Sequence, residues 1–218
     1  MKRHTLLEYI AGRIAKIARP HPVRVGIDGV DGVGKTTFAD ELIAPLKSLG
    51  HAVIRASIDG FHNPRSVRYA QGRESPEGFF RDSFNLEAFV ECVLAPLGPH
   101  GSRRYRRALF DYRSDREISV DEEMAEPSAI ILVDAIFLHQ PRLRPYWDFS
   151  VFLDAPFEIT VARTAARGGG SADPKALSNR RYVEGQRIYL RECTPQKWAD
   201  VVIDNSALDD PRIVKGDT

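Results

Sequence analysis

The segment GVDGVGKT at residues 29–36 constrains the fold of this chain more than any other feature. It fits the pattern of a glycine, four variable residues, then Gly-Lys and a serine or threonine. A β-branched run at residues 23–28 precedes it, and a helical pattern at residues 36–49, closed by Gly50, follows it. Glycines let backbone N–H groups turn inward around an anion, and a helix N-terminus adds about half a positive charge. This order predicts a phosphate-binding loop in an α/β fold.

Residues of this loop have predicted roles in holding a nucleotide. Lys35 is expected to reach the β- and γ-phosphates, and the Thr36 hydroxyl is expected to bind Mg²⁺, which prefers hard oxygen ligands. We therefore predict ATP and Mg²⁺ as cofactors. The alternative is a glycine-rich turn without a chemical role, which the flanking strand and helix disfavour. The residues expected to contact ATP are Gly29, Val30, Asp31, Gly32, Val33, Gly34, Lys35, Thr36 and Thr37.

The rest of the chain alternates between strand and helix patterns. Strands are predicted at residues 51–58, 129–134, 149–153 and 201–203, with a further candidate at 106–112. Helices are predicted at residues 85–97, 158–167 and 175–192, the first with Asn85 as its N-cap. This alternation predicts a mostly parallel sheet with helices on both faces, the three-layer α/β fold of P-loop NTPases.

A length of 218 residues fits one domain, because single hydrophobic cores stop growing near about 250 to 300 residues. We expect residues 1–218 to form it, with an amphipathic helix within residues 1–22. Residues 61–83, rich in Gly, Pro and Arg, are expected to form an acceptor-side loop, and residues 163–176 a short mobile lid hinged at Gly168, Gly169 and Gly170. Loops this long inside a compact domain are usually functional.

Composition excludes several classes of partner. The 31 basic and 30 acidic side chains nearly cancel, so the chain has no general attraction to nucleic acid or to a membrane surface. Cys92 and Cys193 lie in helical patterns rather than in a disulfide or metal spacing, and no secretory or membrane-spanning run is present. We expect a cytoplasmic protein whose partner is a small molecule; a homo-oligomer stays open.

Two carboxylates follow predicted strands. Asp134 closes the buried run AIILVD, so it is expected to face the ligand crevice and contact Mg²⁺; the alternative is a carboxylate that caps the next turn. Asp59, in SIDGFH, is expected to accept the proton of an acceptor hydroxyl, although an isolated Asp-Gly pair is also typical of a turn. Together these residues predict phosphoryl transfer to an alcohol.

The motifs GIDGVDGVGKTTFADEL, IDGFH, DSFNLEAF, FDYRSDRE, ILVDAIFL and RRYVEGQRIYLRE, followed by ADVVIDN, resemble the uridine kinase and phosphoribulokinase group of P-loop kinases, and most of all bacterial uridine kinase-like proteins. The resemblance implies ATP-dependent phosphorylation of a nucleoside 5′-hydroxyl, with uridine or cytidine as the first acceptor. Asp59 then matches the catalytic aspartate, Asp82 the residue that holds ribose hydroxyls, and Tyr112 a nucleobase contact. Arg163 and Arg167 match lid arginines that close over the phosphates.

Two departures from this group concern the acceptor. Asp115 stands where uridine kinases have a histidine, and the DGFH motif, with Gly60 and His62, is also similar to pantothenate kinase-like proteins. His62 is either an acceptor contact or a surface residue. A kinase for pantothenate or a sugar is therefore an alternative. A regulatory NTPase without an acceptor is another, although the guanine-reading N-K-x-D pattern is absent.

Overall fold

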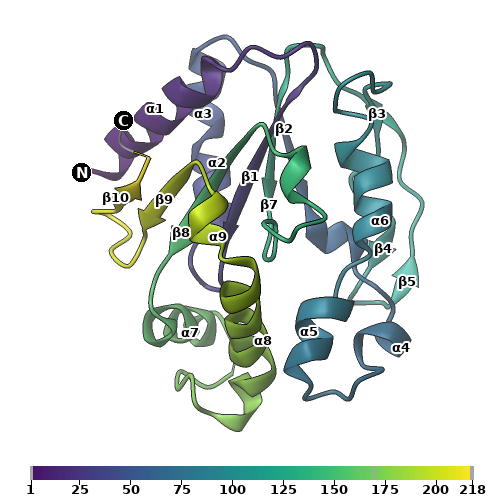
Figure 1. Cartoon of the computed structure of the whole chain (residues 1–218), viewed down its shortest axis with the longest axis vertical. Coiled ribbons are helices and arrows are strands. Elements are labelled where there is room, and N and C mark those ends of the chain that lie inside the picture. Colours follow the sequence, from purple (N-terminus) through teal and green to yellow (C-terminus); the bar gives the residue numbers. More distant parts are fainter. Residues whose placement is uncertain (1, 169, 217–218) are drawn as a thin grey trace.

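A six-stranded sheet forms the centre of the computed structural model, which describes residues 2–168 and 170–216 (Figure 1). The strands lie in the order β10-β9-β8-β1-β7-β2. Neighbouring strands pair in parallel except for β10, which is antiparallel to β9. Their bounds are β1 (Val23–Gly29), β2 (Val53–Ser57), β7 (Ile130–Asp134), β8 (Phe149–Asp154), β9 (Val201–Asp204) and β10 (Arg212–Lys215). The mostly parallel sheet predicted from the alternating pattern is confirmed.

Helices cover both faces of the sheet, because each buried strand sends alternate side chains to opposite sides. On β7, Ile131 and Val133 join one hydrophobic cluster, whereas Ile130 and Leu132 join the other. The first cluster packs against α5 (Pro76–Asp82), α6 (Leu86–Phe89) and α8 (Leu177–Cys193). The second packs against α1 (Arg3–Ala15), α2 (Lys35–Glu41) and α3 (Ile43–Ser48). The three-layer fold is therefore confirmed.

The parallel register brings the carboxyl ends of the central strands to one edge of the sheet. Asp134, the last residue of β7, is paired with Ile27 of β1 and with Ser57, the last residue of β2. The glycine-rich loop follows β1, and a 3₁₀ turn (Ile58–Phe61) follows β2. Residues far apart in sequence therefore meet at this edge, as expected for ligand sites in open parallel sheets.

Three predictions about local structure were wrong in detail. The helix predicted over residues 36–49 is divided into α2 and α3, because Pro45 has no N–H to continue the helical hydrogen bonds. Residues 61–83 are not only loop: they contain α4 (Arg65–Arg68) and α5, and the Ser75 hydroxyl caps α5 by accepting from the N–H of Gly78. The strand predicted at residues 106–112 is reduced to β4 (Phe110–Asp111).

The remaining elements are short. Two antiparallel ribbons join β3 (Arg104–Tyr105) to β6 (Glu123–Met124) and β4 to β5 (Arg116–Glu117). Asn85 caps α6 as predicted, by accepting from the N–H of Ala88, and a π-helical turn (Val90–Leu94) continues it. Other helices are a 3₁₀ turn (Arg144–Tyr146), α7 (Phe157–Ala166) and α9 (Pro195–Trp198). Within the described residues, no helix has both the length and the apolar character needed to cross a membrane.

Candidate active site

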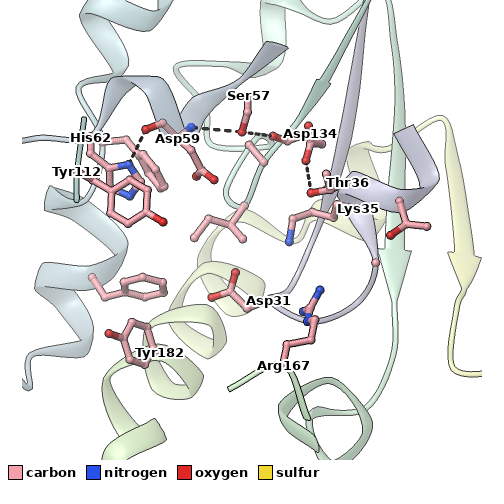
Figure 2. Close-up of a pocket in the computed structure, with 17 residues that line it drawn as sticks. Asp31, Lys35, Thr36, Ser57, Asp59, His62, Tyr112, Asp134, Arg167 and Tyr182 are labelled. Carbon is pink, nitrogen blue, oxygen red and sulfur yellow. Dashed lines mark hydrogen bonds between the residues drawn. The ribbon is translucent and has the colours of Figure 1, made fainter. Parts of the chain in front are cut away.

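A pocket of about 420 Å³ opens at the carboxyl edge of the sheet. The glycine-rich loop and the start of α2 line one side of it, and the ends of β2 and β7 line it at the top of this view (Figure 2). Aromatic side chains of the segments after β2 and β4 line the opposite side, and Arg167, directly after α7, and Tyr182 of α8 lie below. The predicted site residues in its lining are Asp31, Gly32, Gly34, Lys35, Thr36, Thr37, Asp59, His62, Tyr112, Asp134 and Arg167.

The glycine-rich loop has the shape of an anion cradle. Gly32 adopts a φ of +78°, and a Cβ at this position would overlap the carbonyl oxygen of Thr160, so only glycine fits. The Lys35 ammonium donates across the loop to the carbonyl oxygen of Val30 at 2.9 Å. From α8, the Gln186 side chain accepts from the backbone N–H of Asp31. These contacts fit a loop that wraps around phosphate oxygens.

A buried polar network fixes the root of this loop. Asp28, fully buried at the end of β1, accepts from the N–H of Gly29 at 2.7 Å and from the hydroxyl of Tyr189 in α8. His139 Nδ1 lies 2.6 Å from the same carboxylate. Burial, together with the charge of Asp28, raises the pKa of Tyr189 well above its ordinary value, so its hydroxyl remains a donor. The network ties α8 to the glycine-rich loop.

Thr36 and Asp134 form a pair of hard oxygens that suits Mg²⁺. The Thr36 hydroxyl donates to Asp134 Oδ2 at 2.6 Å, and both side chains line the pocket. No group of three or more His, Cys, Asp or Glu side chains that could hold a metal occurs among residues 2–168 and 170–216. Mg²⁺ bound with nucleotide needs only one or two protein oxygens, because phosphates and water supply the rest. The residues present therefore fit this ion.

Arg55 holds the other oxygen of Asp134. Its guanidinium donates to Asp134 Oδ1 at 2.8 Å, to the carbonyl oxygen of Leu132 at 3.0 Å and to Asp40 Oδ1 at 2.9 Å. The sequence-based prediction missed this residue. The sequence contained a signal for it. Arg55 lies between the buried residues Ile54 and Ala56 of a strand, so its side chain points to the opposite face of the sheet, where its charge needs a partner.

Asp59 lies in the 3₁₀ turn directly after β2, and Figure 2 shows its carboxylate directed into the pocket. Removal of water from around it raises the pKa of Asp59, protonated His62 opposes this, and the negative charges of Asp134 and Asp31 raise it further. His62 Nδ1 donates to the Asp59 carbonyl oxygen, 2.9 Å away. Burial lowers the pKa of His62, which favours its neutral form near pH 7.

The wall opposite Lys35 is aromatic. The His62 ring lies between those of Phe84 and Tyr112, with centroid distances of 4.6 and 4.8 Å. Asp115, the departure noted in the sequence, accepts at Oδ1 from the N–H of Arg65 at 3.0 Å and from Arg68 Nη2 at 3.1 Å. Its carboxylate therefore fixes α4 against this wall.

Several predicted residues are not brought into the pocket. Asp82 binds Gln71 Nε2 through its carboxylate, and Arg163 donates to the carbonyl oxygens of Asn205 and Ser206. These partners hold both side chains outside the lining of this pocket. In the loop itself, Gly29 belongs to β1, while Val30 and Val33 are buried in the core. Of the predicted lid glycines, Gly169 lies outside the described residues.

Sequence reasoning also missed the contribution of α8. Tyr182 lines the pocket, and Gln186, one turn further along, binds the glycine-rich loop. The spacing of four residues places both on one face of the helix. This shared face, on a helix that directly follows the predicted lid, was the signal in the sequence that could have identified them.

No model of a known protein family matches the chain. Its sequence is similar to the uridine kinase of Leuconostoc citreum, at 29% identity over 147 residues that cover 67% of this chain and 68% of that protein. Its structure is similar to that of a possible uridine kinase from Bacillus stearothermophilus, with a TM-score of 0.70, 24% identity, and coverage of 90% of this chain and 96% of the other. The phosphoribulokinase of Rhodobacter spheroides is also similar, with a TM-score of 0.58 and 14% identity over 86% of this chain and 71% of the other.

In sequence and in fold the chain is therefore similar to the uridine kinase and phosphoribulokinase-like group of P-loop kinases. Both structural likenesses lie below 25% identity and concern the fold, whereas the names of the sequence relatives concern their activity. Taken together with the pocket, they support a small-molecule kinase.

Proposed function

We propose that this chain transfers the γ-phosphoryl group of ATP to a hydroxyl group of a small molecule. The bond between the γ-phosphorus and the bridging oxygen breaks, its electron pair leaves with ADP, and the hydroxyl oxygen of the acceptor bonds to the phosphorus. The hydroxyl proton passes to Asp59. The observation that carries the proposal is one pocket that contains Lys35, the Thr36–Asp134 pair and the carboxylate of Asp59.

The charged residues have separate tasks in this scheme. Lys35 and Arg167 line the pocket as cations that offset the charge on the phosphoryl oxygens. Thr36 and Asp134 would hold Mg²⁺, which when bound neutralises charge on the phosphates. The raised pKa of Asp59 makes its carboxylate a better proton acceptor than that of an ordinary aspartate.

For the acceptor we propose the 5′-hydroxyl of a nucleoside, with uridine and cytidine first. The name of the Leuconostoc citreum relative supports this choice. Tyr112, which is 39% exposed, lies beside His62 and offers an aromatic face on which a base can stack.

A coupled assay of ADP formation tests the proposal. The purified chain with Mg²⁺ and ATP is offered uridine, cytidine, pantothenate and a set of sugars, and we expect ADP formation that depends on at least one acceptor. Lys35→Ala should weaken ATP binding and slow transfer by on the order of 10²-fold or more, because it removes a cation aimed at the phosphates. The proposal is wrong if the wild-type chain does not bind ATP in the presence of Mg²⁺, if GTP is strongly preferred, or if no acceptor is phosphorylated.

A further inference from the structure

A second hollow adjoins the candidate active site, and six of its lining side chains have no role in the proposed phosphoryl transfer. Its volume is about 320 Å³. It shares the rings of His62, Phe79, Tyr112 and Tyr182 with the active-site pocket. Figure 2 shows His62 and Tyr112 across that pocket from Lys35, so the hollow adjoins it on the side away from the phosphate loop. Its other lining residues are Arg65, Arg68, Tyr69, Ser83, Arg113 and Arg181. We call this hollow the arginine pocket.

The arginine pocket differs from the active-site pocket in charge. Three aspartates, Asp31, Asp59 and Asp134, line the active-site pocket with Lys35 and Arg167. The arginine pocket has four arginines in its lining and no carboxylate among its described lining residues. A hollow lined by cations attracts anions by Coulomb interaction and so raises their local concentration.

Neighbouring carboxylates compensate only part of this positive charge. Arg68 forms a salt bridge with Asp115 at 3.1 Å, and the Asp111 carboxylate attracts Arg113 through Coulomb interaction. Arg181 is buried, and its guanidinium donates to four carbonyl oxygens, those of Arg68, Gly72, Arg73 and Ser75. Carbonyl dipoles satisfy its hydrogen bonds but do not cancel its charge.

Arg65 and Arg113 are the arginines free to bind a ligand. Within the part of the chain that the structure describes, neither forms a salt bridge, and the side-chain hydrogen bonds of both are long; the Arg113 guanidinium also lies over the Tyr112 ring, 5.8 Å from its centroid. Arg65 Nη2 lies 3.5 Å from the carbonyl oxygen of Arg113, and Arg113 Nε lies 3.4 Å from the Tyr112 hydroxyl. A guanidinium presents two parallel N–H groups that match a carboxylate or a phosphate.

We propose that the acceptor carries an anionic group, a carboxylate or a phosphate, that binds Arg65 and Arg113 in the arginine pocket while its hydroxyl lies at Asp59. The inference rests on the proposed phosphoryl transfer. It assigns the shared aromatic rings to the middle of the acceptor, and it revises the choice of uridine and cytidine above in favour of an acceptor, such as a carboxylated nucleoside, that carries a negative charge.

The test compares acceptors with and without an anionic group, with the full chain, Mg²⁺ and ATP. Carboxylate pairs are orotidine against uridine, pantothenate against panthenol and glycerate against glycerol; the phosphate pair is ribulose 5-phosphate against ribulose. We expect kcat/KM for the anionic member of at least one pair to exceed that of the neutral member by on the order of tenfold or more. The type of pair that responds distinguishes a carboxylate from a phosphate.

Variants then test the two arginines. Arg113→Gln and Arg65→Gln should each raise KM for the preferred anion by about tenfold, with a smaller change in kcat and none in the affinity for ATP. The matched control is Arg116→Gln, which removes the same charge from an exposed residue three positions after Arg113 that does not line the pocket. Equal kcat/KM within every pair, or an equal KM in all three variants, would overturn the inference.

Calorimetric binding of each pair in the presence of ADP separates this inference from the proposed function. If an anionic member binds tighter than its neutral partner, and the arginine variants abolish the difference, the arginine pocket is correct even where no phosphate is transferred. In that case phosphoryl transfer is the part that fails. If acceptors are phosphorylated without regard to their charge, the proposed function stands and the arginine pocket falls.

Discussion

The two sides of the pocket are built in different ways. The nucleotide side consists of residues 29–37 with Asp134, which stand on β1, α2 and β7 in the centre of the sheet. The acceptor side consists of residues 58–83 and 110–115, which form only short helices and a two-residue ribbon. A contiguous motif and a regular sheet position the first. The second depends on contacts between segments that are distant in sequence.

Those contacts come largely from α8. Arg181 donates to the carbonyl oxygens of residues between Arg68 and Ser75, which have no strand or long helix of their own. The same helix reaches the nucleotide side through Gln186 and Tyr189. Because β1, α2 and β7 also support the nucleotide side, we expect it to tolerate changes in the packing of α8 better than the acceptor side. The following predictions are ordered from the largest expected effect to the smallest.

Asp59→Asn should give the largest difference between the effect on phosphoryl transfer and the effect on ATP binding. The amide keeps the shape of the carboxylate but cannot take the hydroxyl proton, so kcat should fall by about 10² to 10⁴. The affinity for ATP, measured by calorimetry, should stay within about twofold, because the triphosphate is held by the nucleotide side. Wild-type turnover would show that Asp59 is not the base.

Asp82→Asn is the matched control for that change. Its carboxylate binds Gln71 outside the pocket, so we expect less than about a threefold change in kcat/KM. A loss as large as that of Asp59→Asn would instead support the sequence-based prediction that Asp82 contacts the acceptor.

Arg55→Met tests the nucleotide side alone. Without the guanidinium at Oδ1, the Asp134 carboxylate loses its fixed orientation. We expect the Mg²⁺ concentration for half-maximal activity to rise about 10- to 100-fold, as is typical when a partner of a metal ligand is removed. Arg55→Lys, which keeps the charge without the fork, should lie between the two. An unchanged Mg²⁺ titration in a folded Arg55→Met protein would contradict this role.

Gly185→Ala tests the acceptor side through α8. An added Cβ would come within 2.8 Å of both Phe79 Cδ1 and the carbonyl oxygen of Pro76, so it would push α5 away. The free energy of unfolding should fall by about 1 to 3 kcal/mol and KM for the acceptor should rise several-fold. The affinity for ATP should change little. Gly12→Ala is the control, because nothing lies within 4 Å of its added Cβ.

The pH dependence of kcat/KM is the finest test. Asp59 must be ionised to accept a proton, and its pKa is raised, so activity should fall with decreasing pH at a higher pH than for an ordinary aspartate. Protonated His62 favours the ionised form of Asp59, so His62→Phe should move this fall to still higher pH. His4→Gln, at an exposed position of α1, should leave it in place. A shift in the opposite direction would contradict the coupling.

On the nucleotide side, the structure brings several predicted residues together, and their roles in binding ATP and Mg²⁺ stay predictions. Lys35, Thr36 and Asp134 were assigned from a contiguous motif and a buried strand, and the structure brings them into one pocket. Asp59 and His62 also reach it, although from a turn rather than a strand. Arg163 and Asp82 do not, because backbone carbonyls and Gln71 hold them elsewhere. Their direction depends on partners that no local pattern reveals.

By itself, the sequence determined the phosphate loop, the buried parallel strands and the carboxylates at their ends, because each is encoded within a few consecutive residues by spacing and side-chain type. Only the tertiary structure decided that Arg55 holds Asp134, that α4 and α5 form within residues 61–83, and that Arg65 and Arg113 line one hollow. These features depend on burial and charge shared between distant segments, so they exist only once the chain has folded.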